Sequence, residues 1–335
     1  MTFLSQGSWR AAQRLLCFAA IVMAAEPALA QGSIEVTATA IDHFDKADRE
    51  LKRFGKLEFR GGLELISSAK TFGGISSLRM DPDGARFLAI TDTGRWLRGR
   101  ITYSGGAPSG IADAEMAQML GANGRNLPRG WFDTEALAQD GGTIYVGLER
   151  VHRILKYDFG RTGFRARGVP IPVPVEFKGL PNNKGIEALA VMPKGSPVAG
   201  ALIAISEAAL DGNGNIKAYL IGGPRPGVFA IRRTDDFDIT DCALLPGGDL
   251  LLLERRFSIF RSGVRIRRIS GGDVLPGALV NANLVFQADF GQQIDNFEGI
   301  GVHRAATGET VVTLISDDNF SPLQRTLLMQ FKLVE

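Results

Sequence analysis

The chain has 335 residues, of which 45% are hydrophobic and 22% are charged, so it has the composition of a globular protein with a large core. Its formal net charge of +2 gives no long-range field that would steer it to nucleic acid or anionic lipid, which excludes both as partners. Only Cys242 lies beyond the first thirty residues, so a chain without those thirty residues could form no intramolecular disulfide.

Residues 1–30 have the pattern of a secretory signal peptide. Arg10 and Arg14 precede an apolar run at 15–25, and an A-x-A site ends at Ala30. The apolar run is too short to span a bilayer comfortably, although an uncleaved anchor is the alternative. We therefore expect a mature chain that begins near Gln31, is periplasmic or secreted, and has no membrane segment after cleavage.

Residues 31–56 are interpreted as an N-terminal extension, and residues 57–335 as a single domain. An alternating run at 33–41 precedes a charged stretch at 42–56 that predicts a loop or a short helix. The apolar run at 57–66 predicts a strand, with Gly61 and Gly62 at a bulge.

One short phrase recurs along the rest of the chain. It has an acidic residue, a small residue and Leu or Ile, followed by an apolar strand that ends in another acid; DTEALA at 133–138 and KGIEALAV at 184–191 are complete copies. The equivalent positions lie 59, 52, 54 and 57 residues apart and are Ser76, Glu135, Glu187, Asp241 and Glu298. This regular spacing indicates a repeat protein.

The repeats predict an all-β fold, a β-propeller with five blades. Each unit offers four short strands in about 55 residues, the length expected for a propeller blade. The last repeat has only three strands, so a strand at 57–66 is expected to close the ring. Residues 111–130 are interpreted as one or two helical turns; a sixth blade would form if these residues and 33–45 were strands. A pair of β-sandwiches is the alternative architecture, but it does not explain the fixed period.

The repeated acids predict a ring of carboxylates at one mouth of the central channel, where innermost strands begin. Glu135, Glu187, Asp241 and Glu298 would form this ring, with a second set of acids close behind. That second set, the predicted metal ligands, is Asp92, Glu149, Glu207, Glu254 and Asp317. So many carboxylates cannot all stay ionised without a partner, and calcium suits oxygen ligands from several blades. The alternative is that each acid caps backbone N–H groups of the next blade.

Basic residues beside the acids predict a phosphate site. Arg150 follows Glu149, Arg255 follows Glu254, and Lys184 precedes Glu187. Together with a metal ion, these side chains would stabilise charge on phosphoryl oxygens, although each one alone could simply pair with its neighbouring acid. Three scattered histidines and one mature cysteine disfavour zinc.

Several stretches resemble a family of exported bacterial proteins with a phytase-like domain, described as having the esterase-like activity of phytase. The matching stretches run from about residue 57 to 334 and include FGGISSLRMDPDGARFLAITDTG, NKGIEALAV and LISDDNFSPLQRTLLMQFKL. The resemblance implies a β-propeller, a phosphoesterase or phosphodiesterase activity, and acidic residues at the active site. Carried over by motif, these are Asp92, Glu135, Glu149, Glu187, Glu207, Glu254, Glu298 and Asp317. Ser76 and Asp241 depart from the pattern, because the family has glutamate there.

The leading hypothesis is a periplasmic hydrolase, expected to be monomeric, that acts on a small-molecule phosphate ester. Calcium and nearby Arg or Lys would orient the phosphate, and Glu135, Glu187 or Glu298 would act as the general base. Two alternatives remain open. One is a non-catalytic propeller that binds a ligand or a protein, and the other is a calcium-dependent lactonase or esterase.

Overall fold

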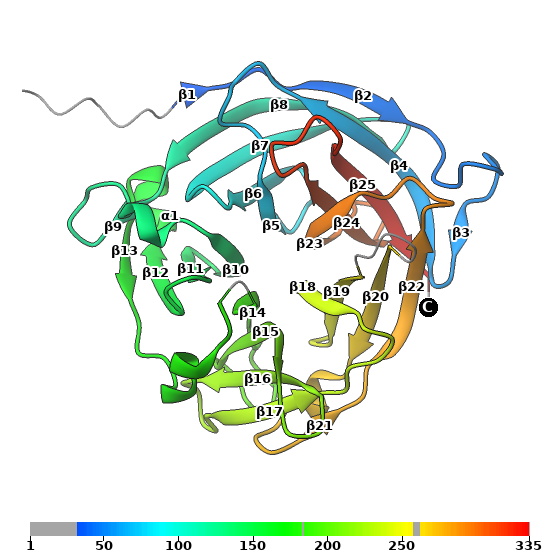
Figure 1. Cartoon of the computed structure of the whole chain (residues 1–335). Coiled ribbons are helices and arrows are strands. Elements are labelled where there is room, and N and C mark those ends of the chain that lie inside the picture. Colours follow the sequence, from blue (N-terminus) through cyan, green and yellow to red (C-terminus); the bar gives the residue numbers. More distant parts are fainter. Residues whose placement is uncertain (1–31, 183, 257–261, 335) are drawn as a thin grey trace, which may run out of the picture. The chain divides into compact units, whose positions relative to one another are not determined.

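The computed structural model describes residues 32–182, 184–256 and 262–334, which belong to one compact unit, Gln31–Glu335. The predicted signal peptide at 1–30 lies outside the described residues. Five mainly antiparallel sheets stand around a common axis as the blades of a β-propeller (Figure 1). The predicted fold and blade number are therefore confirmed, and the six-bladed and sandwich alternatives are wrong.

The first three blades each contain four consecutive strands and one strand from elsewhere in the chain. In each list the innermost strand comes first. The first blade has β5 (Ile75–Met80), β6 (Arg86–Thr91), β7 (Arg95–Ser104), β8 (Ala107–Gln118) and β1 (Gly32–Ser33). The second has β10 (Thr134–Asp140), β11 (Thr143–Leu148), β12 (Arg153–Asp158), β13 (Arg167–Pro170) and β9 (Leu120–Gly121). The third has β14 (Ile186–Val191), β15 (Leu202–Leu210), β16 (Ile216–Ile221), β17 (Gly227–Ile231) and β21 (Leu279–Val280).

The last two blades complete the ring, and the innermost strand of each blade contacts those of its two neighbours. The fourth blade has β18 (Asp238–Leu244), β19 (Leu250–Arg256), β20 (Gly263–Ile269) and β22 (Asn283–Asp289). The fifth has β23 (Asn296–Arg304), β24 (Thr310–Asp317), β25 (Thr326–Leu333), β4 (Leu57–Ile66) and β2 (Thr37–Ile41), with β3 (Arg53–Phe54) paired to β4. Short helices occur in connections: α1 (Phe159–Thr162), η1 (Arg129–Trp131), η2 (Gly163–Arg165), η3 (Val175–Gly179) and η4 (Gly271–Asp273).

Strand β4 closes the ring. It pairs with β25 along its whole length, from Leu57 opposite Leu333 to Leu65 opposite Thr326. This confirms that the strand at 57–66 joins the two ends of the domain. The N-terminal extension adds β2 and β3 beside β4, and β1 beside β8.

Residues 111–130 are mostly strand rather than helix. Strand β8 reaches Gln118 and pairs with β7. The helical structure in this stretch is limited to the 3-10 turn η1. The Ala, Met and Gln residues here favour helix in isolation, but pairing with the long strand β7 outweighs that weak preference.

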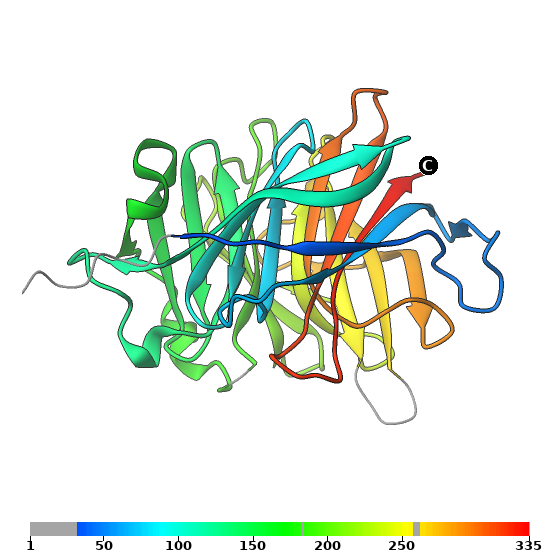
Figure 2. The same cartoon turned by 90° about the horizontal axis from the view of Figure 1, so that it is seen from above.

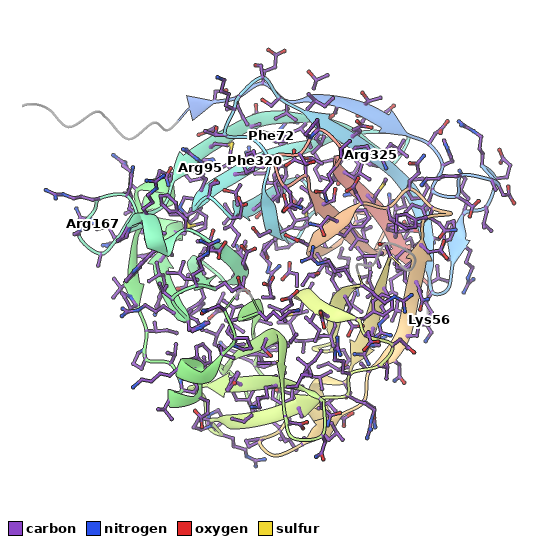
Figure 3. All side chains as sticks on the ribbon, viewed as in Figure 1. Lys56, Phe72, Arg95, Arg167, Phe320 and Arg325 are labelled. Carbon is purple, nitrogen blue, oxygen red and sulfur yellow. The ribbon has the colours of Figure 1, made fainter. Side chains whose placement is uncertain are left out.

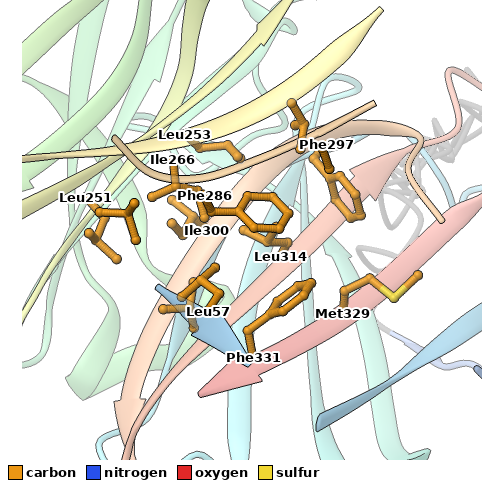
Figure 4. Packing of buried hydrophobic residues seen from close by; sticks show 14 of the residues in the cluster. Leu57, Leu251, Leu253, Ile266, Phe286, Phe297, Ile300, Leu314, Met329 and Phe331 are labelled. Carbon is orange, nitrogen blue, oxygen red and sulfur yellow. The ribbon is translucent and has the colours of Figure 1, made fainter. Parts of the chain in front are cut away.

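The apolar core lies between neighbouring blades. Four consecutive leucines in β19 are fully buried, because alternate side chains enter different inter-blade clusters. Leu251 and Leu253 pack toward the fifth blade with Phe297 and Phe331, as Figure 4 shows, whereas Leu250 and Leu252 pack in the cluster of the third blade. A strand that is covered on both faces needs an unbroken apolar run. This explains why the repeats contain so many unbroken apolar runs.

Candidate functional site

Every innermost strand carries a β-bulge at the same height. The pairing register of β5, β10, β14, β18 and β23 shifts by one residue near the strand's start, so that one residue has no partner on the next strand. The bulged residues are Ser76, Glu135, Glu187, Thr240 and Glu298. The bulge thus gives the three glutamates equivalent positions around the axis.

A second set of side chains comes from the neighbouring strand of each blade. Each member of this set pairs with the residue that lies two places before the bulged residue of the innermost strand. In the fifth blade, for example, Asp317 pairs with Asn296. The residues at this position are Asp92, Glu149, Glu207, Arg255 and Asp317. Four blades therefore supply a carboxylate here, and the fourth blade supplies a guanidinium.

The three glutamates and the whole second set meet in one polar cavity of about 260 Å3 at a mouth of the channel. On the same face the loop between β24 and β25 projects beyond the sheets, at the lower edge of Figure 2. The cavity is lined by Asp92, Asp133, Glu135, Glu149, Arg150, Glu187, Glu207, Arg255, Glu298, Asp317 and Asn319. The structure thus brings together nine of the twelve predicted site residues, when Asp241 of the predicted ring is counted.

Three of these carboxylates form a tight cluster that could hold a metal ion. One oxygen each from Glu149, Glu187 and Glu207 lies within 4.8 Å of the other two, and all three residues are buried. The N–H of Gly185 donates a 2.9 Å hydrogen bond to Glu149 Oε1. A Cβ at Gly185 would lie 2.9 Å from Cγ of Glu149, so this close approach needs glycine.

Burial and mutual repulsion raise the pKa values of the buried glutamates in this cavity. Burial raises the pKa of Glu187 well above its ordinary value, and the charges of Glu135 and Glu149 add to the shift. Burial also raises the pKa of Glu135 well above its ordinary value, with contributions from Glu298 and Asp133. Among the described residues, none donates a hydrogen bond to the Glu135 carboxylate.

Asp92 and Asp317 complete the acidic wall on the other side. Burial and the charge of Glu298 raise the pKa of Asp92 to about 6 and that of Asp317 to about 8. Oδ1 of Asp92 is buried without a hydrogen-bond partner in the described part of the chain. Such an oxygen is costly unless something positive faces it.

Two arginines line the cavity, Arg150 from the second blade and Arg255 from the fourth. Nη1 of Arg255 lies 2.7 Å from Glu298 Oε1 and also donates to the side chain of Asn296. Burial opposes the charge on Arg255, but the carboxylates of Glu298 and Glu187 outweigh it and raise its pKa. Arg150 donates a 2.7 Å bond to Asp133 and keeps most of its side chain exposed.

The third predicted phosphate ligand, Lys184, stands apart from the cavity lining. Its Nζ lies 3.4 Å from Asp238 and 3.7 Å from Glu207, so it pairs with one acid of the three-residue cluster and with one acid outside the cavity lining.

Two predicted acids lie elsewhere. Asp241 is fully buried beyond the bulge and pairs with Arg79, so it is absent from the ring. Glu254 is fully buried between Arg265 and Arg267, outside the cavity, and is therefore not a candidate ligand. Both differences from the prediction arise in the fourth blade. There the adjacent residues Thr240 and Arg255 occupy the positions that are acidic in most of the other blades.

Asp133 and Asn319 belong to the cavity although neither was predicted as a site residue. Both have positive φ, of 71° and 49°, a conformation that Asn and Asp tolerate better than most residues. Their positions in the sequence could have identified them. Asp133 lies two residues before the bulged Glu135, and Asn319 directly follows two aspartates at the end of β24.

Among the described residues, no helix has the length and apolar character needed to cross a membrane.

Comparison with solved structures finds similar chains at low sequence identity. Glutaminyl cyclase of Myxococcus xanthus covers 90% of this chain and 98% of its own, at 12% identity and a TM-score of 0.43. The PQQ-bound aldose sugar dehydrogenase of Streptomyces coelicolor covers 81% and 97%, at 11% identity and a TM-score of 0.41. At these values the likeness carries no argument about function. No curated protein matches the sequence.

A family model matches residues 70–320, which include all five innermost strands and the whole lining of the acidic cavity. The model describes a phytase-like domain with the esterase-like activity of phytase. The match covers most of the chain, and the chain therefore belongs to the phytase-like family.

Proposed function

We propose that this protein is a phosphoesterase or phosphodiesterase whose acidic cavity holds a calcium ion. The observation that carries the proposal is the cluster of Glu149, Glu187 and Glu207 beside the guanidinium of Arg255 in one cavity. A carboxylate cluster alone can bind a cation. A carboxylate cluster beside an arginine also suits a phosphate that contacts both the bound cation and the guanidinium.

The donor set fits calcium. Calcium binds oxygens at about 2.3–2.6 Å, so oxygens on opposite sides of one ion lie roughly 4.6–5.2 Å apart. The three clustered oxygens lie within 4.8 Å of one another. No histidine or cysteine is among the described residues that line the cavity, which favours a hard cation over zinc.

Each remaining residue has a role that its position supports. Calcium, when bound, would supply Lewis-acid stabilisation of charge on a phosphoryl oxygen. Arg255 is held by Glu298 and Asn296 and would bind a second oxygen, and Arg150 also lines the cavity. Glu135 accepts no hydrogen bond from a described residue and has a raised pKa, so it would take the proton of the attacking water.

The test is hydrolysis of 4-nitrophenyl phosphate and bis(4-nitrophenyl) phosphate by the metal-stripped protein, with and without millimolar calcium. We expect turnover that needs calcium and falls by about 10²–10⁴ in Glu135→Gln. Glu50→Gln, which removes an exposed carboxylate before β3, is the matched control and should keep full activity.

Absence of phosphate-ester turnover by the folded, calcium-loaded protein would contradict the proposal. A lactone or 4-nitrophenyl acetate, assayed beside the phosphate esters, then distinguishes the two alternatives. Turnover of either compound indicates a lactonase or esterase, whereas inactivity toward all of them indicates a binding propeller.

A further inference from the structure

A second pocket, of about 440 Å3, adjoins the acidic cavity and has the opposite charge. It is lined by Lys70, Thr71, Thr93, Arg95, Gln118, Asn126, Phe132 and Phe320. It contains two cationic and two aromatic side chains and no carboxylate among its described lining residues.

The two sites share walls. Thr93 follows Asp92, Phe132 precedes Asp133, and Phe320 follows Asn319, and the second residue of each pair lines the acidic cavity. Adjacent residues are only about 3.8 Å apart at their Cα atoms, so one small molecule can reach both sites.

Arg95 is the unusual residue of this pocket. It begins β7 and is half-buried, yet its guanidinium makes no hydrogen bond or ion pair with any residue that the structure describes. Two other arginines of the same strand are paired, Arg98 with Glu115 and Arg100 with Asp113.

The lack of a partner makes the charged form of the Arg95 side chain less favourable. Burial alone lowers the pKa of Arg95, because no neighbouring carboxylate compensates for the lost hydration. Lys70, on the same wall, is exposed and is also without a hydrogen bond or ion pair to a described residue. An oxyanion between the two would restore the missing interactions.

The aromatic residues give the pocket an apolar side. Phe320 is 45% exposed and stands close to Gly74, where an added Cβ would lie 2.7 Å from its ring. Phe132 is half-buried and stands close to Gly94, where an added Cβ would lie 3.0 Å from its ring. Figure 3 shows Arg95 and Phe320 beside each other over the first blade. The exposed ring of Phe320 suits contact with a planar or apolar part of a ligand.

We propose that this pocket is an oxyanion subsite that binds a second anionic group of the substrate. The proposal rests on the proposed function, because the phosphate ester itself occupies the acidic cavity. The substrate class is then a phosphate ester whose leaving group has a ring or apolar linker and carries a carboxylate or a second phosphate.

The first experiment measures specificity. We compare kcat/KM for 4-nitrophenyl phosphate with that for its ring-carboxylated analogue, in the presence of calcium. Arg95→Gln should lower the preference for the carboxylated compound by about tenfold or more, the usual effect of losing a charged hydrogen bond. Arg304→Gln is the matched control, because Arg304 is exposed at the other end of β23; it should keep the wild-type preference.

The second experiment does not depend on turnover. Calorimetric titration with benzene-1,3-dicarboxylate should show binding that weakens about tenfold in Arg95→Gln and is unchanged in Arg304→Gln. If Arg95→Gln fails to fold, Lys70→Gln replaces it, since Lys70 is exposed.

The outcomes separate the two proposals. Binding that depends on Arg95, without any phosphate-ester turnover, keeps the subsite and rejects the proposed reaction. Turnover with an unchanged preference and unchanged dicarboxylate affinity in Arg95→Gln overturns the subsite. Absence of dicarboxylate binding to the wild-type protein overturns it as well.

Discussion

The guanidinium of Arg79 and the carboxylate of Asp241 form a two-bond ion pair across the axis of the ring, each bond 3.0 Å long. The same guanidinium donates to backbone carbonyls of Leu137, Leu189 and Ile300. Arg79 therefore links the innermost strands of all five blades at one height, directly beneath the acidic cavity.

Asp241→Asn is expected to destabilise the protein by about 3–5 kcal/mol, because it leaves the buried charge of Arg79 without its partner. Asp158→Asn, which breaks the exposed pair with Arg161, should cost less than about 1 kcal/mol. The free energy of unfolding in urea checks both values. Equal effects of the two substitutions would show that the axial pair is dispensable.

Glu254→Gln tests the placement of Glu254 away from the metal site. Removing its charge leaves Arg267, which is 4% exposed, without a carboxylate partner, and leaves Arg265, which is 2% exposed, with only the exposed Asp235. We therefore expect a loss of about 3–5 kcal/mol in stability. The stabilisation by calcium should keep its wild-type size in this variant. A large loss of calcium response in a protein that still folds would return Glu254 to the ligand set.

The period of the repeats allowed much of the fold to be predicted. Each innermost strand and the closing strand at 57–66 were located correctly, because a blade needs apolar runs at a fixed spacing and the last repeat lacked one strand. The helical interpretation of 111–130 failed because pairing with β7 depends on contacts that composition does not encode.

The site was predicted less completely, for a reason specific to β-structure. A shift of one residue turns a side chain to the other face of a strand, and the one-residue bulge in β18 is not visible in the sequence. The repeat spacing therefore predicted Asp241 and Glu254, whereas their neighbours Thr240 and Arg255 occupy the equivalent positions. Acids were expected there because three other blades carry an acid at the first position and four at the second.

Stability of the metal-free protein should fall as the pH rises from about 4 to 8. The folded-state pKa values of Asp92 and Asp317, about 6 and about 8, lie above the value of about 3.9 expected in the unfolded chain. The folded protein thus holds more protons than the unfolded chain in this window, and the free energy of unfolding decreases with pH. Urea unfolding at pH 5 and pH 8 measures the difference. A metal-free protein that is more stable at pH 8 would refute this account of the acidic wall.

The most direct test of the central claim is thermal unfolding of the metal-stripped mature protein with and without millimolar calcium. Calcium at a hundred times its dissociation constant should stabilise the folded state by about 2.7 kcal/mol, seen as a rise in Tm. The rise should be lost in Glu187→Gln, whose carboxylate belongs to the three-residue cluster, and kept in Glu50→Gln. An unchanged Tm of the wild-type protein in calcium would contradict the claim that the acidic cavity is a metal site.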